Sequence, residues 1–258
     1  AVVFCLNDTA TGTGSAVFGQ NNRAGGNYSF VAGSGNYASA NQGVAFGNND
    51  TATGSNTFIS GYNNYATQNA SGVFGGHHNT ASGQNAAVLG GTANVASGFS
   101  SVVINQSNTA TNNNTLAGGY QSLASGNISF ALGYRDTATA QGSFSIGHDN
   151  KSSGANSFTT GYSNLASGSN SAALGEDNTV SGSGAFVTGG DNTVSGSYSA
   201  VLGVEDTASG FAAFTVNRGN KASGNHSAAF GSYNTAPSFN EFVIGNYATN
   251  YTAANTTA

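Results

Sequence analysis

The sequence offers few residues that could perform catalysis. Its histidines are scattered along the chain, at His77, His78, His148 and His226. The adjacent pair is not accompanied by an Asp or Cys in a nucleophile pattern, and we interpret all four as surface residues in turns. Glycine-rich strings such as Gly12-Thr13-Gly14 precede no predicted helix, so they do not indicate a phosphate-binding loop. The sequence therefore predicts that the protein is not an enzyme.

Calcium binding is the metal chemistry that the sequence suggests. Carboxylates are concentrated in three consecutive fourteen-residue segments, at Glu176, Asp177, Asp191, Glu205 and Asp206. If those segments stack at the strand spacing, about 5 Å, the carboxylates form one column of hard oxygen ligands that suits Ca²⁺. The alternative is a solvated acidic ridge, partly balanced by the basic side chains Lys151, Arg218 and Lys221. No other cofactor is predicted.

Composition excludes several classes of protein. Of 258 residues, 39 are Gly, one is Pro, none is Met or Trp, and only 6% are charged, which is unlike an ordinary soluble enzyme. An apolar content of 38% is too high for a disordered chain. Five basic residues give no cationic surface for nucleic acid or anionic lipid. No apolar run is long enough to span a bilayer, and the single Cys5 allows no intramolecular disulfide.

A repeat of fourteen residues runs through the chain. An aligned residue, usually Ala, recurs at positions 10, 24, 38, 52, 66, 81, 96, 110, 124, 138, 152, 166, 180, 194, 208, 222 and 236. Two intervals are fifteen residues long, and both coincide with a doubled glycine, Gly75-Gly76 and Gly90-Gly91, which predicts bulges. We number the places of each unit from the aligned residue. Seventeen units without a linker predict one continuous, quasi-one-dimensional array.

Each unit predicts one coil with two short strands. Side chains alternate with period two over places six to ten and over places thirteen to three, with turn residues between them. Places six, eight and ten carry Ser, Ala or Val, and Gly, whereas places thirteen, one and three carry Asn or Asp, Ala, and Gly. We expect these small residues to fill the narrow interior. Asn or Asp at place thirteen would form a ladder that satisfies turn backbone groups.

The outward places differ between the two strands. Places fourteen and two are mostly Thr and Ser, so we expect this outer surface to be exposed to water. Places seven and nine supply at least one large apolar residue in every unit: Phe18, Phe30, Phe46, Phe58, Phe74, Leu89, Ile104, Leu116, Phe130, Phe144, Phe158, Leu174, Phe186, Leu202, Phe214, Phe230 and Phe242. Such a stripe exceeds the apolar patch that monomers expose, so it predicts a homo-oligomer. Three copies around a threefold axis fill the space naturally, and twofold pairing is the alternative.

Tyrosines recur at one place in the turns. Tyr62, Tyr120, Tyr134 and Tyr162 all occupy place eleven. Repeated aromatic side chains on a weakly charged surface can contact protein or glycan, and they can equally pack over the turn. The sequence therefore suggests a receptor-binding surface here and does not identify the receptor.

The repeat resembles a known family. Units such as Asn170-Ser171-Ala172-Ala173-Leu174-Gly175 and Ser197-Tyr198-Ser199-Ala200-Val201-Leu202-Gly203, joined through Asn-Thr-Val-Ser-Gly or Asn-Leu-Ala-Ser-Gly, resemble the head repeats of YadA-like trimeric autotransporter adhesins. The resemblance covers essentially the whole chain. It implies a left-handed parallel β-roll, a homotrimer, an extracellular cell-surface location and binding to matrix or host surfaces. The chain departs from the family in having Phe where such heads usually carry Val or Ile, and in showing no stalk or anchor.

The predicted domain is one array with irregular ends. A partial coil covers residues 1–9, complete coils run from 10 to about 249, and the pattern decays in a tail at 250–258. An uncapped end of a solenoid exposes backbone donors and acceptors. We therefore expect either further sequence that covers the ends or end-to-end self-association into a filament.

Four functions fit these features. The first is a structural and adhesive surface fibre, a rigid rod that mediates attachment to surfaces, matrix or other cells. A phage or virus tail fibre, on a virion, and an end-to-end polymerising extracellular filament share the same pattern. Ice binding by the Thr and Ser rank at places fourteen and two is the fourth. That rank is interrupted by larger residues such as Arg23, Tyr37, Leu123 and Lys151.

Overall fold

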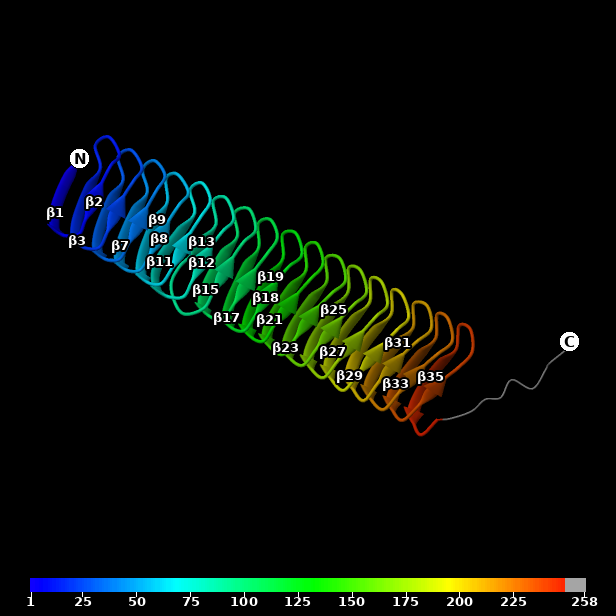
Figure 1. The fold of residues 1–258 in the computed structure, drawn as a ribbon. Coiled ribbons are helices and arrows are strands. Elements are labelled where there is room, and N and C mark those ends of the chain that lie inside the picture. The colour runs from blue at the N-terminus through cyan, green and yellow to red at the C-terminus, as the bar shows by residue number, and fades with distance from the viewer. Residues whose placement is uncertain (249–258) are drawn as a thin grey trace, which may run out of the picture. The chain divides into compact units, whose positions relative to one another are not determined.

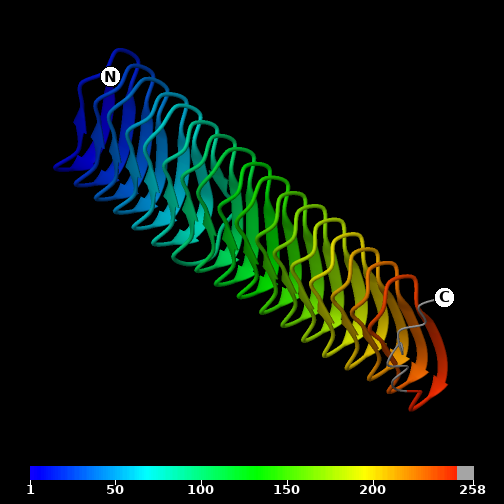
Figure 2. The same ribbon diagram turned by 90° about the vertical axis from the view of Figure 1, so that its right-hand side faces the viewer.

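The chain forms an all-β parallel solenoid of about 17 coils with two strands in each coil, as the period predicts. The structure is a computed structural model and describes residues 1–248. The predicted end of the array near residue 249 and the tail 250–258 lie outside the described residues. The chain divides into two compact units, Ala1–Asp136 and a second one that begins at Thr137, and each is described separately. Figures 1 and 2 show the coils of each unit from two directions.

Unit 1 contains ten long strands and nine short strands. The long strands are β1 (Val2–Leu6), β3 (Ala16–Gln20), β5 (Phe30–Ser34), β7 (Val44–Asn48), β9 (Phe58–Tyr62), β11 (Gly72–His77), β13 (Ala87–Val88), β15 (Val102–Gln106), β17 (Leu116–Tyr120) and β19 (Phe130–Tyr134). The short strands are β2 (Thr9–Ala10), β4 (Arg23–Ala24), β6 (Tyr37–Ala38), β8 (Thr51–Ala52), β10 (Tyr65–Ala66), β12 (Thr80–Ala81), β14 (Val95–Ala96), β16 (Thr109–Ala110) and β18 (Leu123–Ala124).

Unit 2 has the same construction through residue 248. Its long strands are β21 (Phe144–His148), β23 (Phe158–Tyr162), β25 (Ala172–Glu176), β27 (Phe186–Gly190), β29 (Ala200–Val204), β31 (Phe214–Arg218), β33 (Ala228–Ser232) and β35 (Phe242–Asn246). Its short strands are β20 (Thr137–Ala138), β22 (Lys151–Ser152), β24 (Leu165–Ala166), β26 (Thr179–Val180), β28 (Thr193–Val194), β30 (Thr207–Ala208), β32 (Lys221–Ala222) and β34 (Thr235–Ala236).

Neighbouring coils pair in parallel with a register of one repeat. Val17 of β3 lies opposite Val31 of β5, and Ala24 of β4 lies opposite Ala38 of β6. Every place therefore forms a column along its unit, with successive members about 4.8 Å apart. Any property that recurs at one place in the sequence becomes a continuous feature of the surface or of the interior.

The strands differ slightly from the predicted ones. Long strands occupy places seven to eleven rather than six to ten, and short strands contain only places fourteen and one. The long strand ends because place twelve is left-handed, with φ 57° at Asn21. The short strand ends because the N–H groups of Thr11 and Gly12 both donate to the carbonyl of Ala24, at 3.0 and 3.5 Å, so the ladder does not continue.

The interior consists of small side chains, as predicted. Val17 and Ala24 are fully buried, and Ser15 and Asn22 are 1% exposed. Gly12, at place three, leaves no room for a side chain, because a Cβ there would lie 1.9 Å from the carbonyl oxygen of Gly26 in the next coil. This close contact between coils favours glycine at place three, although Ala40 and Gln68 occupy the same place in other coils.

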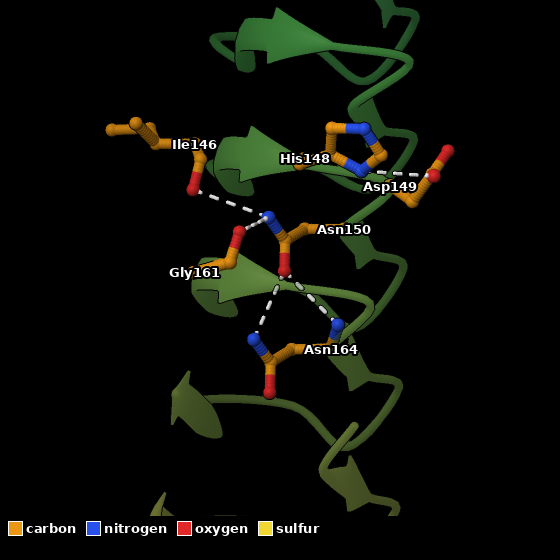
Figure 3. A network of polar contacts seen from close by, with 6 residues as sticks. All are labelled: Ile146, His148, Asp149, Asn150, Gly161 and Asn164. Carbon is orange, nitrogen blue, oxygen red and sulfur yellow. Dashed lines mark hydrogen bonds and ion pairs between the residues drawn. The ribbon is translucent and has the colours of Figure 1, made fainter. Parts of the chain in front are cut away.

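The predicted asparagine ladder at place thirteen is confirmed. In Figure 3, Nδ2 of Asn150 donates to the carbonyl oxygens of Ile146 at 3.2 Å and Gly161 at 2.8 Å. Its Oδ1 accepts hydrogen bonds from both the backbone nitrogen and Nδ2 of Asn164, each at 3.0 Å. One buried side chain thus satisfies carbonyls in its own coil and the next one, and an N–H of the next coil.

The doubled glycines lie where the long-strand ladder is irregular. The pairing of β9 with β11 shifts register between Phe74 and His77, which confirms the bulge at Gly75-Gly76. In the following coil β13 ends at Val88, and pairing resumes only at Thr92, through single bridges to His77 and Gln106. These two coils are therefore one residue longer than the rest and present a different outer surface.

Candidate functional site

The most extensive candidate site in each unit is the outer surface of its long strands, which we call the apolar face. It consists of the side chains at places seven and nine, and it includes all seventeen residues predicted as an oligomer interface. Within residues 1–248, none of the seventeen is buried. Those with the larger exposed fractions are Phe18, Phe46, Phe58, Phe74, Leu89, Phe144, Phe186, Leu202 and Phe242. The others are partly exposed: Phe30, Ile104, Leu116, Phe130, Phe158, Leu174, Phe214 and Phe230.

Aromatic rings on this face pack against each other from coil to coil. In unit 1 the ring centroids of successive phenylalanines are 5.2–6.1 Å apart along a series that comprises Phe4, Phe18, Phe30, Phe46, Phe58 and Phe74. In unit 2, Phe230 packs against Phe214 at 5.3 Å and against Phe242 at 5.2 Å. These spacings are those of favourable aromatic pairs. The rings form an ordered surface rather than separate exposed side chains.

In many coils one of places seven and nine carries a large side chain and the other a small one. Packing within a single chain explains this alternation. A Cβ on Gly72, at place seven, would lie 3.0 Å from Cε2 of Phe74, so that ring covers the glycine. A Cβ on Gly118, at place nine, would lie 2.7 Å from Cγ1 of Ile104 and 2.9 Å from Cδ2 of Leu132. The large side chain in one place therefore occupies the space of the small one. This packing accounts for the alternation without a symmetry axis.

The face is hollowed where the aromatic series of unit 1 is interrupted. Beyond Phe74, an apolar depression of about 490 Å³ opens. Its main apolar lining comes from Leu89, Val102, Ile104, Leu116 and Phe130. Leu89, which lies in the second of the two longer coils, lines one edge of the depression. The depression belongs to the apolar face and is part of the same uncovered surface.

The five carboxylates predicted as a calcium site do not share one surface. Glu176, Asp177, Asp191 and Glu205 are exposed, whereas Asp206 is buried at place thirteen of the ladder. Glu205 pairs with Arg218, with Oε1 3.2 Å from Nη2, and this hydrogen bond raises the pKa of Arg218. Within residues 1–248, no group of three or more His, Cys, Asp or Glu side chains is arranged to hold a metal ion.

Asp206 belongs instead to a set of acidic residues inside the ladder. With Asp8 and Asp50 it takes the position that Asn occupies elsewhere, and the backbone N–H of the next coil donates to its Oδ1. The Oδ2 atoms of these three residues are enclosed and have no hydrogen-bond partner. Burial raises the pKa of Asp50 to about 6 and also raises the pKa of Asp206, while hydrogen bonds from Asn64 and Asn220 act in the opposite direction.

The four tyrosines at place eleven lie on the surface, but only two of them contact each other. Tyr120 and Tyr134 stack with ring centroids 5.1 Å apart. Tyr62 contacts His78 edge-on at 5.8 Å, and Tyr162 stacks on His148 at 4.9 Å. These histidine partners were not predicted from the sequence, although His148 stands at place eleven in the repeat itself. Place eleven therefore carries both imidazole and phenol rings.

The histidines lie on the surface, as interpreted from the sequence, but His77 and His148 end strands β11 and β21 rather than lying in turns. Two of the histidines are close together. Nδ1 of His77 lies 3.1 Å from Nδ1 of His78. His226 is in a different surrounding, packed between Phe211 and Phe239 with ring centroids 5.6 and 5.5 Å away. His148 has Asp149 beside it, with Nδ1 and Oδ2 3.0 Å apart.

No protein-family model matches the chain, and no curated protein matches it. The fold is a β-solenoid of fourteen-residue coils, and membership of the adhesin family stays a prediction from the repeat residues. Among residues 1–248 the structure has no helix with the length and apolar character needed to cross a bilayer.

Proposed function

We propose that the chain is the shaft of an extracellular adhesive fibre, in which identical copies associate through the apolar face. The observation that carries the proposal is that each coil from β3 to β35 presents at least one large apolar side chain at places seven and nine, which residues 1–248 leave uncovered. Places seven and nine carry no charged residue in any coil. A surface of this extent and composition is typical of an interface between subunits.

Free energy favours association through this face. The portion of each large side chain that remains exposed is worth roughly 0.5–1 kcal/mol on burial. Seventeen such residues on each of two chains therefore supply on the order of 17–34 kcal/mol, which is larger than the cost of about 4–15 kcal/mol for joining two bodies. The resemblance to trimeric adhesin heads favours three copies, and it also supports the extracellular location and the adhesive role.

The outer surface of the short strands supports an adhesive rather than an enzymatic role. Its side chains are mostly Thr, and the adjoining turns carry exposed tyrosines such as Tyr28 and Tyr198, which are 66% and 68% exposed. Amphipathic aromatic residues on a weakly charged surface suit contacts with protein or glycan. In the assembly this side faces away from the apolar face and is the side available to a receptor.

A matched pair of variants tests the assembly. Phe18, Phe46 and Phe74 are changed together to Ser, and the control changes Tyr28, Tyr65 and Tyr198 together to Ser, which removes three exposed aromatic rings outside the apolar face. We expect the first variant to associate more weakly and to dissociate at a higher protein concentration in sedimentation than the wild type does. The control should keep the wild-type association, and both should keep the β circular dichroism spectrum. Unchanged association of the first variant would contradict an interface at the apolar face.

Adhesion needs a separate measurement. Beads coated with the assembled chain are passed over immobilised matrix proteins and a glycan array, beside beads coated with an unrelated protein of similar charge. We expect selective retention on at least one surface, reduced in the triple tyrosine variant. Absence of retention on every surface would remove the adhesive role and leave the structural shaft.

A further inference from the structure

The fifteen-residue coil that contains the bulge at Gly75-Gly76 carries two adjacent histidines on its outer surface. His77 ends strand β11 and pairs with Tyr62, so despite the extra residue it takes the position of place eleven. His78 follows at the position of place twelve, with φ 58°. Both side chains are exposed. Their planes are nearly perpendicular, at 80°, and the Nδ1 atoms lie 3.1 Å apart. The turn thus brings two equivalent nitrogen atoms to the same point in solvent.

A residue of the adjoining coil holds the far nitrogen of His77. Oγ1 of Thr92 lies 3.0 Å from Nε2 of His77 and can accept its hydrogen. The amide of Asn63 lies 3.5 Å from Nε2 of His78, and it accepts the hydrogen of that nitrogen only when its oxygen, rather than Nδ2, is turned toward the ring. The ring of Tyr62 also packs edge-on against His78 at 5.8 Å. An outer hydrogen bond on the second nitrogen is the usual support of a metal-binding histidine, because it fixes the ring and directs the free nitrogen outward.

The separation of the two Nδ1 atoms matches a shared metal ion. With metal–nitrogen distances of about 2.0–2.1 Å, two neighbouring ligands are about 2.9 Å apart in a square-planar site and about 3.3 Å apart in a tetrahedral one. The observed 3.1 Å lies between these values. Without a metal ion the pair can share only one hydrogen, so one nitrogen donates and the other accepts.

We propose that Nδ1 of His77 and Nδ1 of His78 together bind a divalent transition-metal ion of the Cu²⁺, Ni²⁺ or Zn²⁺ class, with water at the remaining positions. Imidazole nitrogen suits these ions, whereas Ca²⁺ and Mg²⁺ prefer oxygen ligands. A site with only two protein ligands is consistent with the absence of any three-residue cluster of metal ligands within residues 1–248. The site lies outside places seven and nine, and the proposal does not rest on the proposed assembly.

The chain supplies a matched control at the same two places of a regular coil. His148 and Asp149 also stand at places eleven and twelve, and Nδ1 of His148 lies 3.0 Å from a carboxylate oxygen rather than from a second imidazole. His148 therefore tests whether a histidine at this position binds the metal ion without a second imidazole beside it. His226, packed between two phenylalanines, is the second control.

The test is titration of the full chain with NiCl₂ while the four imidazole rings are observed by NMR. Paramagnetic Ni²⁺ broadens the signals of nearby rings, so the readout identifies the site even if other groups bind the ion. We expect the His77 and His78 signals to disappear at the lowest Ni²⁺ concentrations, with His148 and His226 affected only later. Simultaneous broadening of all four rings, or retention of the His77 and His78 signals, would overturn the proposal.

Variants separate chelation from binding to a single ring. Calorimetry with ZnCl₂ should show at least tenfold weaker binding in His77→Ala and in His78→Ala, and about tenfold weaker binding in Thr92→Val, whose supporting hydroxyl is lost. His148→Ala should bind as the wild type does. Circular dichroism checks that each variant remains folded, which we expect because both histidines are exposed. Wild-type affinity in both single-histidine variants would also overturn the proposal.

Discussion

Oδ1 of Asp50 accepts a hydrogen bond from the backbone nitrogen of Asn64 at 2.8 Å, while Oδ2 of the same carboxyl group is enclosed without a partner. In the adjoining coil, Nδ2 of Asn64 donates to the carbonyl oxygens of Ser60 and Gly76 at 3.0 Å each. Asp50 takes the same position in the ladder, but it has Oδ2 where Asn64 has the donor Nδ2. An ionised carboxylate there cannot donate to a carbonyl, whereas a neutral acid can.

Replacing Asp50 by Asn should therefore stabilise the fold at neutral pH. In Asp50→Asn, the Nδ2 group can donate a hydrogen bond where the carboxylate Oδ2 cannot. The substitution also removes a buried charge. Both changes favour the folded state. We expect a gain of about 1–3 kcal/mol, which corresponds to a rise of roughly 2–4 °C in Tm per kcal/mol for a chain of this size. Thermal melts at pH 7.5 check this, and a lower Tm in Asp50→Asn would show that the carboxylate has a favourable partner.

The pH dependence of stability follows from the same site. Because burial raises the pKa of Asp50 from 3.8 to about 6, the folded state holds its proton more tightly than the unfolded state does. The resulting stabilisation is complete below pH 3.8 and is lost as the pH rises through about 6. Asp206 shifts in the same direction.

We therefore expect the difference in Tm between Asp50→Asn and the wild type to be small at pH 3.5 and to widen up to pH 7. Melts in a series of buffers at constant ionic strength measure it. A difference that does not change with pH would contradict a pKa raised by folding.

The converse change tests the ladder in unit 2. Nδ2 of Asn178 donates to the carbonyls of Leu174 and Gly189 at 3.0 and 2.9 Å, and Oδ1 accepts from Asn192. Asn178→Asp keeps the acceptor and removes the donor, so it should cost roughly 1–3 kcal/mol at pH 7 and less at pH 4, where the acid is protonated. Denaturant melts at the two pH values compare it with the wild type. Equal stability at pH 7 would mean that the ladder donors contribute little.

Glycine at place ten makes a prediction with an internal control. Gly33 has φ 124°, and a Cβ there would lie 2.0 Å from the carbonyl oxygen of Gly47. Gly75 has nearly the same φ, 129°, but a Cβ there would meet no atom within 4 Å. Both changes to Ala incur backbone strain of roughly 1–3 kcal/mol, and only Gly33→Ala adds the clash. Thermal melts should show a clearly larger loss for Gly33→Ala, and equal losses would argue against the close stacking of coils.

Much of this structure was predictable because the repeat makes each place a column. The two strands per coil, the small interior, the Asn ladder and the outward Phe18 and Leu202 all follow from the alternation of side chains with the fourteen-residue period. The buried position of Asp206 was also predictable from its place thirteen, although the predicted calcium site combined it with the exposed Glu205. Consecutive residues of an extended chain point to opposite sides, so these two carboxyl groups separate.

The strand boundaries and the histidine pair were harder to predict. Left-handed φ values occur at places five and twelve in residues as different as Tyr28, Ala70 and Asn21, so residue type gives little indication of where each strand ends. The approach of His77 to His78 depends on φ at His78 and on the extra residue in its coil. Neither leaves a periodic signal, because the feature occurs in a single coil.

The mass of the protein in solution tests the central claim most directly. Sedimentation equilibrium at micromolar concentration should give an assembly of several chains, and three times the 25.5 kDa of one chain is the expected value. The apolar face should then be inaccessible to hydrophobic dyes. A stable species of 25.5 kDa at that concentration would contradict the account, because the large apolar side chains of every coil would then be exposed to water.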